Sequence, residues 1–433
     1  MSLSLTVHRG TNQIGGTCIE IAHPDGPRLI LDAGRPLDAP QNAQGFVPSS
    51  LDLTRPATVL ICHAHQDHWG ILHEMPSDWP VWTGPISERL IRLGHMMNGR
   101  ALAQPTQAWR YHQPFQIGPF TITAWLTDHS APDAAMLLIE GAGQRIFYTG
   151  DFRTHGRKGK LVKNLMAHPP ADIDLLITEG TNLGTDKPTV PETRIEQRLV
   201  RLLDKVPGRI FVYWSAQNID RSVSLFRAAR QRRCRMYVDL YTAEIMDLTA
   251  VKSSRLPRVT PDFPELCLMV TTAQSRVRNR NDDMRAAKDA LIARCKASGQ
   301  AISARALPAR GIVAIRDSSL TDFQRAGITP GPDDAFVFSS WAGYADTIAA
   351  RSFALMRETG ARIEHIHTSG HASAADLTEF VRTLRPKRIV PVHGENWHLP
   401  HEGFADLLRL ADGENYPLAG ASSAPSAASS ISR

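Results

Sequence analysis

Thr58-Val59-Leu60-Ile61-Cys62-His63-Ala64-His65-Gln66-Asp67-His68 joins an apolar run to a cluster of histidine and aspartate residues. Four of its last six positions carry metal-binding side chains, which core packing or a solvated face rarely requires. The apolar run predicts a buried β-strand, so the ligands follow a strand end. Both imidazoles of a His-x-His pair can reach one metal ion, and Asp67 and His68 can turn towards a second. The stretch therefore predicts a two-metal hydrolase.

Other candidate ligands also follow predicted strands. In the first 180 residues, four further apolar runs each end within about three residues of one of Asp32, His129, Asp151 and Glu179. Near the other end of the chain, predicted strands at 362–367 and 388–392 lead to His371 and His393. Strand ends are where a rigid sheet can hold ligands from distant sequence positions around one point. We therefore expect the front and the back of the chain to complete one site.

Mixed nitrogen and oxygen ligation favours Zn²⁺ and leaves Mn²⁺ open. A carboxylate at Asp151 could bridge two ions. A hydroxide between the ions would then be the nucleophile, because a bound metal lowers the pKa of water to about 7.

The middle of the chain has a different order of predicted elements. From about 187 to 350, predicted helices and strands alternate, which is typical of a parallel sheet covered by helices. We predict that 1–186 and 351–417 form the two parts of one domain, with 187–350 inserted between them. The end, 418–433, is rich in Ala, Ser, Gly and Pro, so we predict a disordered tail and no further domain.

Composition limits the class of protein and its location in the cell. The 433 residues are 42 % apolar and 21 % charged, with no leader-like start and no apolar run long enough to cross a membrane. The five cysteines form no Cys-x-x-Cys pair, which favours a reducing, cytoplasmic location. Residues 221–310 contain 18 Lys and Arg against 8 Asp and Glu, within a chain of net charge +6. This segment either meets a phosphate-bearing partner or coats an exposed helix; charge alone favours neither.

These motifs, in this order, resemble those of the beta-CASP group of metallo-beta-lactamase-fold hydrolases, which includes RNA-processing nucleases such as bacterial ribonuclease J. The resemblance extends from about Arg9 to Gly413. It implies an α/β fold, in which an αββα metallo-beta-lactamase sandwich carries an inserted α/β beta-CASP domain with a parallel sheet flanked by helices.

The resemblance also implies roles for individual residues. One metal would be bound by His63, His65 and His129, the second by Asp67, His68 and His393, with Asp151 shared. Asp32 would orient a ligand without binding metal. Ser369 and His371 would contact the scissile phosphate, with Glu179 holding His371 in place. The predicted catalytic residues are therefore Asp67, His371 and Glu179.

The predicted function is that of a zinc-dependent ribonuclease acting on single-stranded RNA. Internal cleavage and 5′-3′ exonuclease activity both stay open, as does assembly into a homo-oligomer, and no membrane partner is expected. By the resemblance, His393 favours RNA over DNA. The alternatives are a DNA nuclease, a hydrolase of small esters, thioesters or lactones, and a metal-free binding relative.

Overall fold

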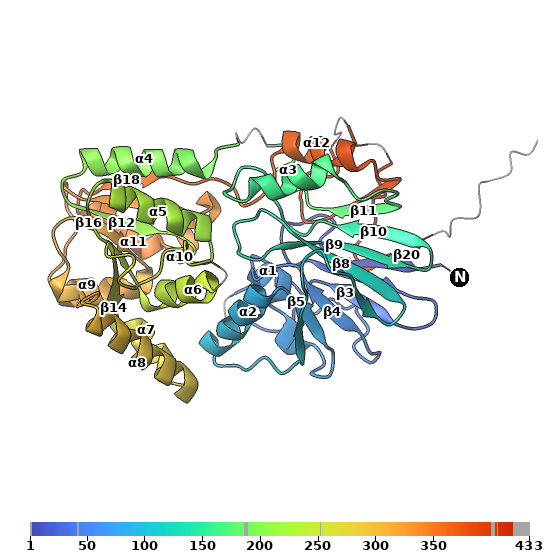
Figure 1. Ribbon diagram of the computed structural model, residues 1–433, viewed down its shortest axis with the longest axis horizontal. Helices are drawn as coiled ribbons and strands as arrows, with labels where there is room; N and C mark the ends of the chain where they lie inside the picture. Colours follow the sequence, from blue (N-terminus) through green and yellow to red (C-terminus); the bar gives the residue numbers. More distant parts are fainter. Residues whose placement is uncertain are drawn as a thin grey trace, which may run out of the picture.

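The computed structural model describes residues 2–40, 43–185, 189–251, 253–399, 403–404 and 406–418. The predicted tail therefore lies outside the described residues, apart from Leu418. The chain forms two lobes, drawn on the right and the left of Figure 1. No described helix is both long and apolar enough to cross a membrane.

The first lobe contains two stacked sheets. One has the strand order β20-β1-β2-β3-β4-β5-β6, with β20 (Asn415–Pro417), β1 (Ser4–Arg9), β2 (Cys18–Ala22), β3 (Arg28–Leu31), β4 (Thr58–Ile61), β5 (Val81–Thr83) and β6 (Thr106–Ala108). The other has the order β19-β11-β10-β9-β8-β7, with β19 (Arg388–Pro391), β11 (Leu175–Thr178), β10 (Gln144–Tyr148), β9 (Ala135–Gly141), β8 (Phe120–Leu126) and β7 (Phe115–Ile117). The last described strand of the chain, β20, thus pairs with the first.

Alternation along buried strands creates the layers of this lobe. Leu60 of β4 lies in the core between the two sheets, whereas Val59 and Ile61 pack in the cluster on the outer face, which includes helix α2 (Pro85–Met97). Helices α3 (Gly159–Ala167) and α12 (Ala374–Leu384) cover the outer face of the second sheet. Because both sheets are buried on both faces, their strands read as continuous apolar runs. The result is the predicted αββα sandwich.

The second lobe is built on one parallel sheet. Its strand order is β15-β14-β13-β16-β12-β17-β18, with β15 (Ala301–Ser303), β14 (Leu266–Val270), β13 (Met236–Val238), β16 (Gly311–Ala314), β12 (Arg209–Tyr213), β17 (Ala335–Phe338) and β18 (Arg362–His365). One face packs against α4 (Glu192–Lys205), α5 (Ile219–Gln231), α6 (Leu240–Ala250) and α8 (Asp282–Ala297). The other packs against α9 (Leu320–Arg325) and α11 (Ala350–Glu358). This is the helix-covered parallel sheet that the sequence predicts.

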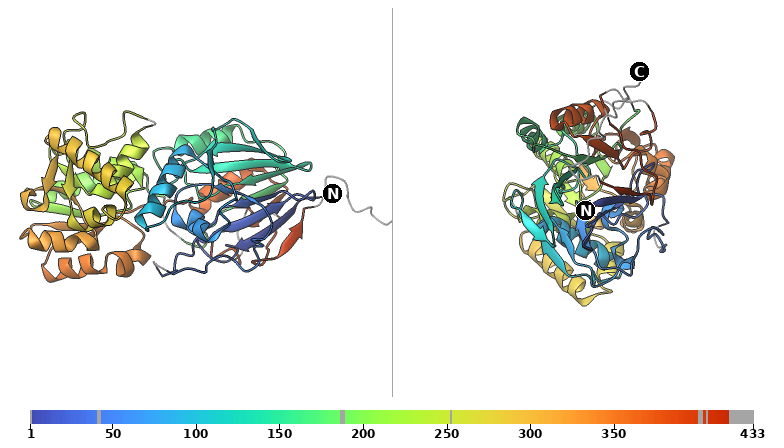
Figure 2. Two further views of the ribbon diagram at one scale, coloured as in Figure 1. Left: turned by 90° about the horizontal axis from the view of Figure 1, so that it is seen from below. Right: turned by 90° about the vertical axis from the view of Figure 1, so that its right-hand side faces the viewer.

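Short elements complete the lobes. They are α1 (Gln66–Trp69), η1 (Leu72–Glu74), α7 (Thr272–Arg278), η2 (Ala304–Ala306), η3 (Asp317–Ser319), η4 (Ala342–Tyr344) and α10 (Ala345–Ile348). In Figure 2 the two lobes lie side by side along the longest axis, with the N-terminus at the far end of the first lobe.

The second lobe extends further along the chain than the boundary predicted at residue 350. Strand β18 pairs with β17 in parallel, and Met356 of α11 packs under the same sheet. The returning chain supplies the edge strand of the inserted sheet before it re-enters the first lobe. Helices α10 and α11 are separated at Ala349, where φ is −135°, and the predicted strand 362–367 ends at His365.

A buried network of charged side chains joins the lobes. Arg153 of the first lobe donates to Asp220 of α5 at 2.7 Å and lies 3.7 Å from Glu192 of α4. Arg221 of α5 in turn donates to Glu192 at 3.0 Å. Arg153 and Arg221 are fully buried and Glu192 nearly so. Because a buried charge is tolerated only when it is paired, this network fixes how the lobes meet.

Candidate metal centre

Seven ligand-type side chains converge at strand ends of the first lobe. The motif from His63 to His68 follows β4, His129 follows β8, Asp151 follows β10 and His393 follows β19. They form two groups, and within each group the ligand atoms lie within 4.8 Å of one another. The structure thus brings together every ligand residue that the sequence analysis named.

The first group consists of three imidazoles. His65 Nδ1 lies 3.1 Å from His63 Nε2 and 3.1 Å from His129 Nε2. These three nitrogens face one another without a carboxylate between them at hydrogen-bond distance. Imidazole nitrogens at this spacing are typical of a Zn²⁺ site.

The second group combines imidazoles and carboxylates. His68 Nε2 lies 3.1 Å from Asp151 Oδ2, and His393 Nε2 lies 3.3 Å from Asp67 Oδ2. The same Asp151 oxygen is 3.7 Å from His63 Nε2 and 3.9 Å from His129 Nε2. Asp151 therefore lies between the two groups, where one carboxylate could serve both ions.

The donor set fits a metal. Asp151 Oδ1 is buried and has no hydrogen-bond partner, although a buried carboxylate oxygen normally has one. Burial and the neighbouring histidines lower the pKa of His63 and His129 well below the usual value, and burial lowers that of His65 to about 4. Neutral imidazoles keep a lone pair for coordination. A cation would satisfy the unpartnered oxygen and use these lone pairs.

Partners behind the ligands fix which nitrogen faces the centre. His68 Nδ1 lies 2.8 Å from Asp32 Oδ2, and Asp32 also accepts from the Tyr148 hydroxyl at 2.5 Å. His129 Nδ1 lies 2.6 Å from the carbonyl oxygen of Gly370. In both histidines the other nitrogen, Nε2, is left for a metal. Asp32 therefore lies where the sequence analysis placed it, against a ligand and behind the site.

Cys62 also lies behind the site. Its thiol donates to Asp32 at 3.0 Å and lies 3.0 Å from His63 Nδ1. Burial, followed by the charge of Asp32, raises the pKa of Cys62 well above its usual value. The side chain is therefore a protonated thiol, which supports the ligands from behind.

His371 lies beside the centre, held by two neighbours. Its Nδ1 lies 2.9 Å from Glu179 Oε2 and 3.2 Å from Thr181 Oγ1. Burial alone would lower the pKa of His371, but the charges of Glu179 and Asp151 outweigh it and raise the pKa to about 9. The imidazole is thus protonated at neutral pH, with Nε2–H as its remaining donor.

The loop before His371 is anchored by residues of the first lobe. The Ser369 carbonyl accepts from Arg153 at 3.1 Å and from His155 at 3.0 Å, and the Ser369 hydroxyl accepts from the Asn182 amide at 3.1 Å. Gly370 packs against the loop that contains His129 and Ser130. A Cβ added at Gly370 would lie 2.6 Å from Ser130 Oγ. Only glycine allows this approach, and the approach places His371 beside the ligands.

Sequence analysis gave no role to several supporting residues. Thr181 lies 2.9 Å from His393 Nδ1 as well as near His371, so one hydroxyl serves both histidines. Tyr148, Arg153 and His155 also lacked an assignment. Thr181 and Arg153 each lie within two residues of a named site residue, Glu179 or Asp151, and this adjacency was the signal available.

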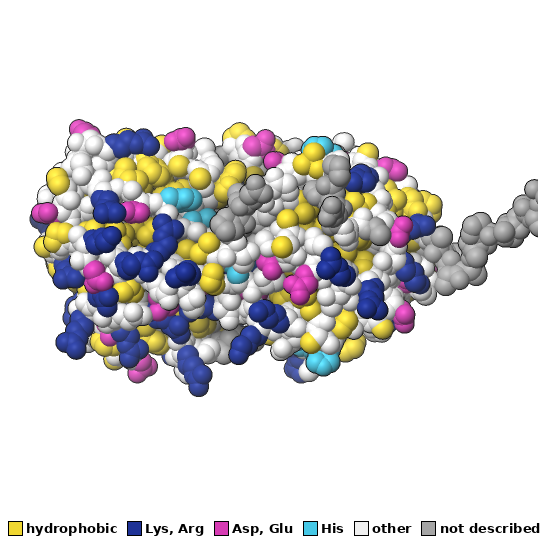
Figure 3. All heavy atoms as spheres, turned by 90° about the horizontal axis from the view of Figure 1, so that it is seen from above, with side chains coloured by type: hydrophobic (Ala, Val, Ile, Leu, Met, Phe, Trp, Pro, Cys, Tyr) yellow, Lys and Arg dark blue, Asp and Glu magenta, His cyan; other side chains and the backbone are white. Residues whose placement is uncertain are grey.

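Surface charge is concentrated on the second lobe. Figure 3 shows Lys and Arg side chains gathered there, on the left. In the 221–310 segment, however, Arg232 pairs with Asp204 at 2.5 Å, while Arg227 and Arg230 each lie 3.8 Å from a glutamate. These arginines therefore coat an exposed helix, which is the second of the two interpretations of the basic segment.

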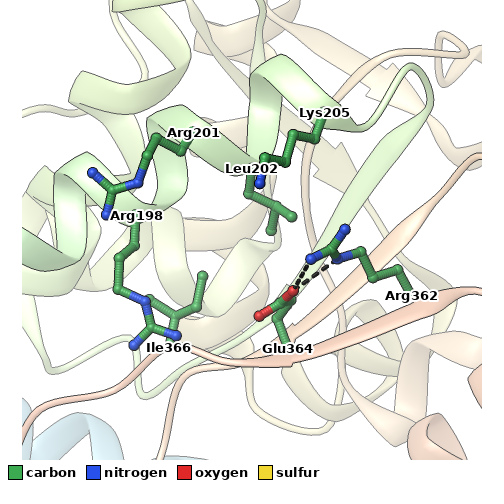
Figure 4. Close-up of a pocket in the computed structure, with 7 residues that line it drawn as sticks. All are labelled: Arg198, Arg201, Leu202, Lys205, Arg362, Glu364 and Ile366. Atoms are coloured by element: carbon green, nitrogen blue, oxygen red, sulfur yellow. Dashed lines mark hydrogen bonds and ion pairs between the residues drawn. The ribbon is translucent and has the colours of Figure 1, made fainter.

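A separate basic groove of about 160 Å³ lies between α4 and β18 (Figure 4). Its cations are Arg198, Arg201, Lys205 and Arg362. Arg362 pairs with Glu364 at 2.7 Å, whereas Arg201 and Lys205 are exposed and have no acidic partner among the described residues.

Two domain families match this chain. Residues 28–234 match the "Beta-lactamase superfamily domain", and residues 358–415 match the "Zn-dependent metallo-hydrolase RNA specificity domain". Together with the αββα sandwich and the inserted sheet, these matches agree with the predicted resemblance to the beta-CASP group of metallo-beta-lactamase-fold hydrolases.

Within that group the chain is similar to ribonuclease J. It is 25 % identical to Ribonuclease J of Helicobacter pylori over 92 % of this chain and 57 % of that protein. It is 23 % identical to Ribonuclease J 1 of Streptococcus pyogenes over 89 % of this chain and 67 % of that protein. The chain thus spans little more than half the length of its H. pylori relative.

A solved structure shares the fold. A crystal structure of an Enterococcus faecalis V583 protein of unknown function superposes with a TM-score of 0.73. It covers 96 % of this chain and all of that chain, at 17 % identity.

Proposed function

We propose that this protein is a zinc-dependent ribonuclease that cleaves single-stranded RNA. The observation that carries the proposal is the double ligand group with Asp151 between its halves and His371, held by Glu179, beside it. The match to an RNA specificity domain and the similarity to ribonuclease J support RNA as the substrate. A cytoplasmic location is consistent with this role.

The ligand groups define how two Zn²⁺ ions would be held, with Mn²⁺ as the alternative. His63, His65 and His129 would hold one, and Asp67, His68 and His393 the other, with Asp151 shared. When bound, such ions activate water and polarise the phosphate. Asp32 and the Gly370 carbonyl keep the histidine rings oriented.

The remaining residues act on the phosphodiester. His371 holds a proton at Nε2, which can stabilise charge on the phosphate or pass to the leaving oxygen. Glu179 and Thr181 fix the ring through Nδ1. The Ser369 hydroxyl accepts from Asn182 and from the His371 amide, so its own O–H is the donor available to a phosphate oxygen.

We further propose that residues from about 187 to 366 form a substrate-binding lobe inserted into the catalytic domain. The separate parallel sheet and the return of the chain through β18 to Ser369 support this division. RNA would lie where the lobes meet, since His371 and its loop are anchored there by Arg153.

The test is cleavage of end-labelled, single-stranded RNA and DNA by the purified protein with Zn²⁺ or Mn²⁺. We expect RNA cleavage that falls more than about a hundredfold in His65→Ala, since even the outer partners of metal ligands typically contribute about 10- to 100-fold. His168→Ala, an exposed histidine, is the matched control. RNA carrying a 5′ monophosphate or triphosphate then distinguishes release of single nucleotides from internal fragments.

Two outcomes would reject the proposal. One is hydrolysis of a lactone or thioester panel without RNA cleavage, which favours a small-ester hydrolase. The other is RNA cleavage that survives in His65→Ala. Cleavage of DNA in preference to RNA would reassign the substrate and leave the metal centre in place.

A further inference from the structure

An exposed tryptophan projects from the second lobe near the metal ligands. Trp341 leaves 49 % of its surface exposed, which is unusual for a large aromatic residue. It follows β17 and directly precedes η4 and α10, which lie on the inner side of the second lobe in Figure 1. Its exposure needs an explanation.

The indole is held in place by its neighbours. A Cβ on Gly343 would lie 2.4 Å from the Trp341 ring, so the ring rests directly on the glycine backbone. The Tyr344 ring meets it edge-on, with centroids 5.1 Å apart and planes at 90°. Trp341 is therefore supported from within its own loop, and much of it still faces solvent.

This loop lies beside the segment that leads to the metal centre. The Ser339 hydroxyl donates to the Ile366 carbonyl at 2.5 Å, and His365 Nε2 lies 2.9 Å from the Ser340 carbonyl oxygen. Ile366 is followed three residues later by Ser369, whose loop carries His371 beside the candidate ligands. Trp341 therefore comes directly after two residues that are bonded to the approach to the metal centre.

We propose that Trp341 is a stacking platform for one base of single-stranded RNA beside the metal centre. This proposal rests on the proposed ribonuclease function and adds a residue that would bind the RNA strand. Every base has a π-face, so an aromatic platform binds without selecting sequence. A supported, rigid ring loses little freedom when a base covers it.

The test compares Trp341→Ala and Trp341→Phe with the wild type. Ile348→Ala is the matched control, because Ile348 is 40 % exposed in the same segment and has no ring. The substrates are one intact oligoribonucleotide and a set in which each member has a single abasic nucleotide. Affinity for the same labelled RNAs is measured in EDTA by fluorescence anisotropy, since binding does not require cleavage.

We expect Trp341→Ala to bind intact RNA on the order of tenfold more weakly, mainly as a raised KM, with Trp341→Phe close to the wild type. When the abasic nucleotide takes the position whose base stacks on Trp341, the affinity of the wild type should fall by the same factor. The affinity of Trp341→Ala should not fall further at that position. Ile348→Ala should match the wild type.

Equal binding by the wild type and Trp341→Ala would overturn the proposal. The proposal would also be overturned if Trp341→Ala bound every abasic RNA more weakly than the wild type by one constant factor. That result would indicate a disturbed loop and not the loss of one stacking contact. If the wild type binds RNA but does not cleave it, the ribonuclease function fails while the platform is still judged from the anisotropy data. If it neither binds nor cleaves, both proposals fail.

Discussion

The two lobes use their polar side chains in opposite ways. The first lobe buries histidines and acids around one point, and several of them are held by a second partner, as Asp32 holds His68. The second lobe keeps cations such as Arg201 and an aromatic ring, Trp341, on its surface. Buried, doubly held groups suit chemistry that depends on position, whereas exposed groups suit contact with a partner that moves past them. Under the proposed function, catalysis would belong to the first lobe and much of the substrate contact to the second.

The largest expected effect is in the first lobe, at Asp151. Asp151→Asn keeps the shape but removes the charge between the two ligand groups. We expect cleavage of every substrate to fall by more than about a hundredfold, with fewer metal ions bound per chain. Elemental analysis together with a single-turnover assay measures both quantities.

Asp172→Asn, at an exposed position, is the control for this change. It should retain wild-type metal content and wild-type rate. An Asp151→Asn protein that keeps both would show that the carboxylate does not join the two groups, and catalysis could then no longer be assigned to this centre.

The next effect concerns the junction between the lobes. Arg153→Met would leave Asp220 and Glu192 without one of their buried partners. We expect the free energy of unfolding to fall by about 3–5 kcal/mol, since removing one member of a buried ion pair strands the other. Cleavage should also fall, because Arg153 holds the Ser369 carbonyl in the loop that carries His371. Denaturant unfolding and kcat on one short RNA provide the readouts.

Arg92→Met serves as the comparison, because Arg92 pairs with Glu88 at 2.9 Å on helix α2 and its side chain is 44 % exposed. Its loss should cost about 1 kcal/mol or less and should leave kcat unchanged. Similar losses in both variants would mean that the junction has no special part in setting the site.

Most of this arrangement could be predicted from the sequence, because the patterns that predict it involve residues close together along the chain. Apolar runs that end in ligand-type residues predict strands and site residues together, as at Ile61 and His63. Helix α8 begins at Asp282 because the Asn281 side chain caps it by accepting from the Met284 amide. Such features depend on neighbours within a few residues.

The features that could not be predicted depend on contacts between residues that are far apart in the sequence. Arg153 gains its role only when α5 brings Asp220 to it, 67 positions along the chain. The boundary at 350 fell short because β18 pairs with β17 across the intervening α11. The charge of the basic segment 221–310 left a phosphate-bearing partner open, yet folding pairs Arg232 with Asp204. Charge along a sequence does not reveal which charges remain free.

The smallest expected effect tests which cations of the second lobe meet RNA. Arg201 and Lys205 line the groove between α4 and β18 and lack an acidic partner among the described residues, whereas Arg227 and Arg230 lie near glutamates. For single strands, the slope of log K against log salt changes by about 0.7 for each phosphate contact. Arg201→Ala with Lys205→Ala should therefore make the slope shallower by about 1.4, with little change in kcat.

Arg227→Ala with Arg230→Ala removes the same formal charge from residues that are 54 % and 67 % exposed. It should leave the slope within error of the wild type, because these cations already have partners. The measurement is RNA affinity at several salt concentrations. If both double variants shift the slope equally, RNA senses only the net charge of the lobe, and the groove is no distinct part of its path. A shift confined to Arg201 and Lys205 extends the substrate surface from the metal centre to the edge strand that leads to His371.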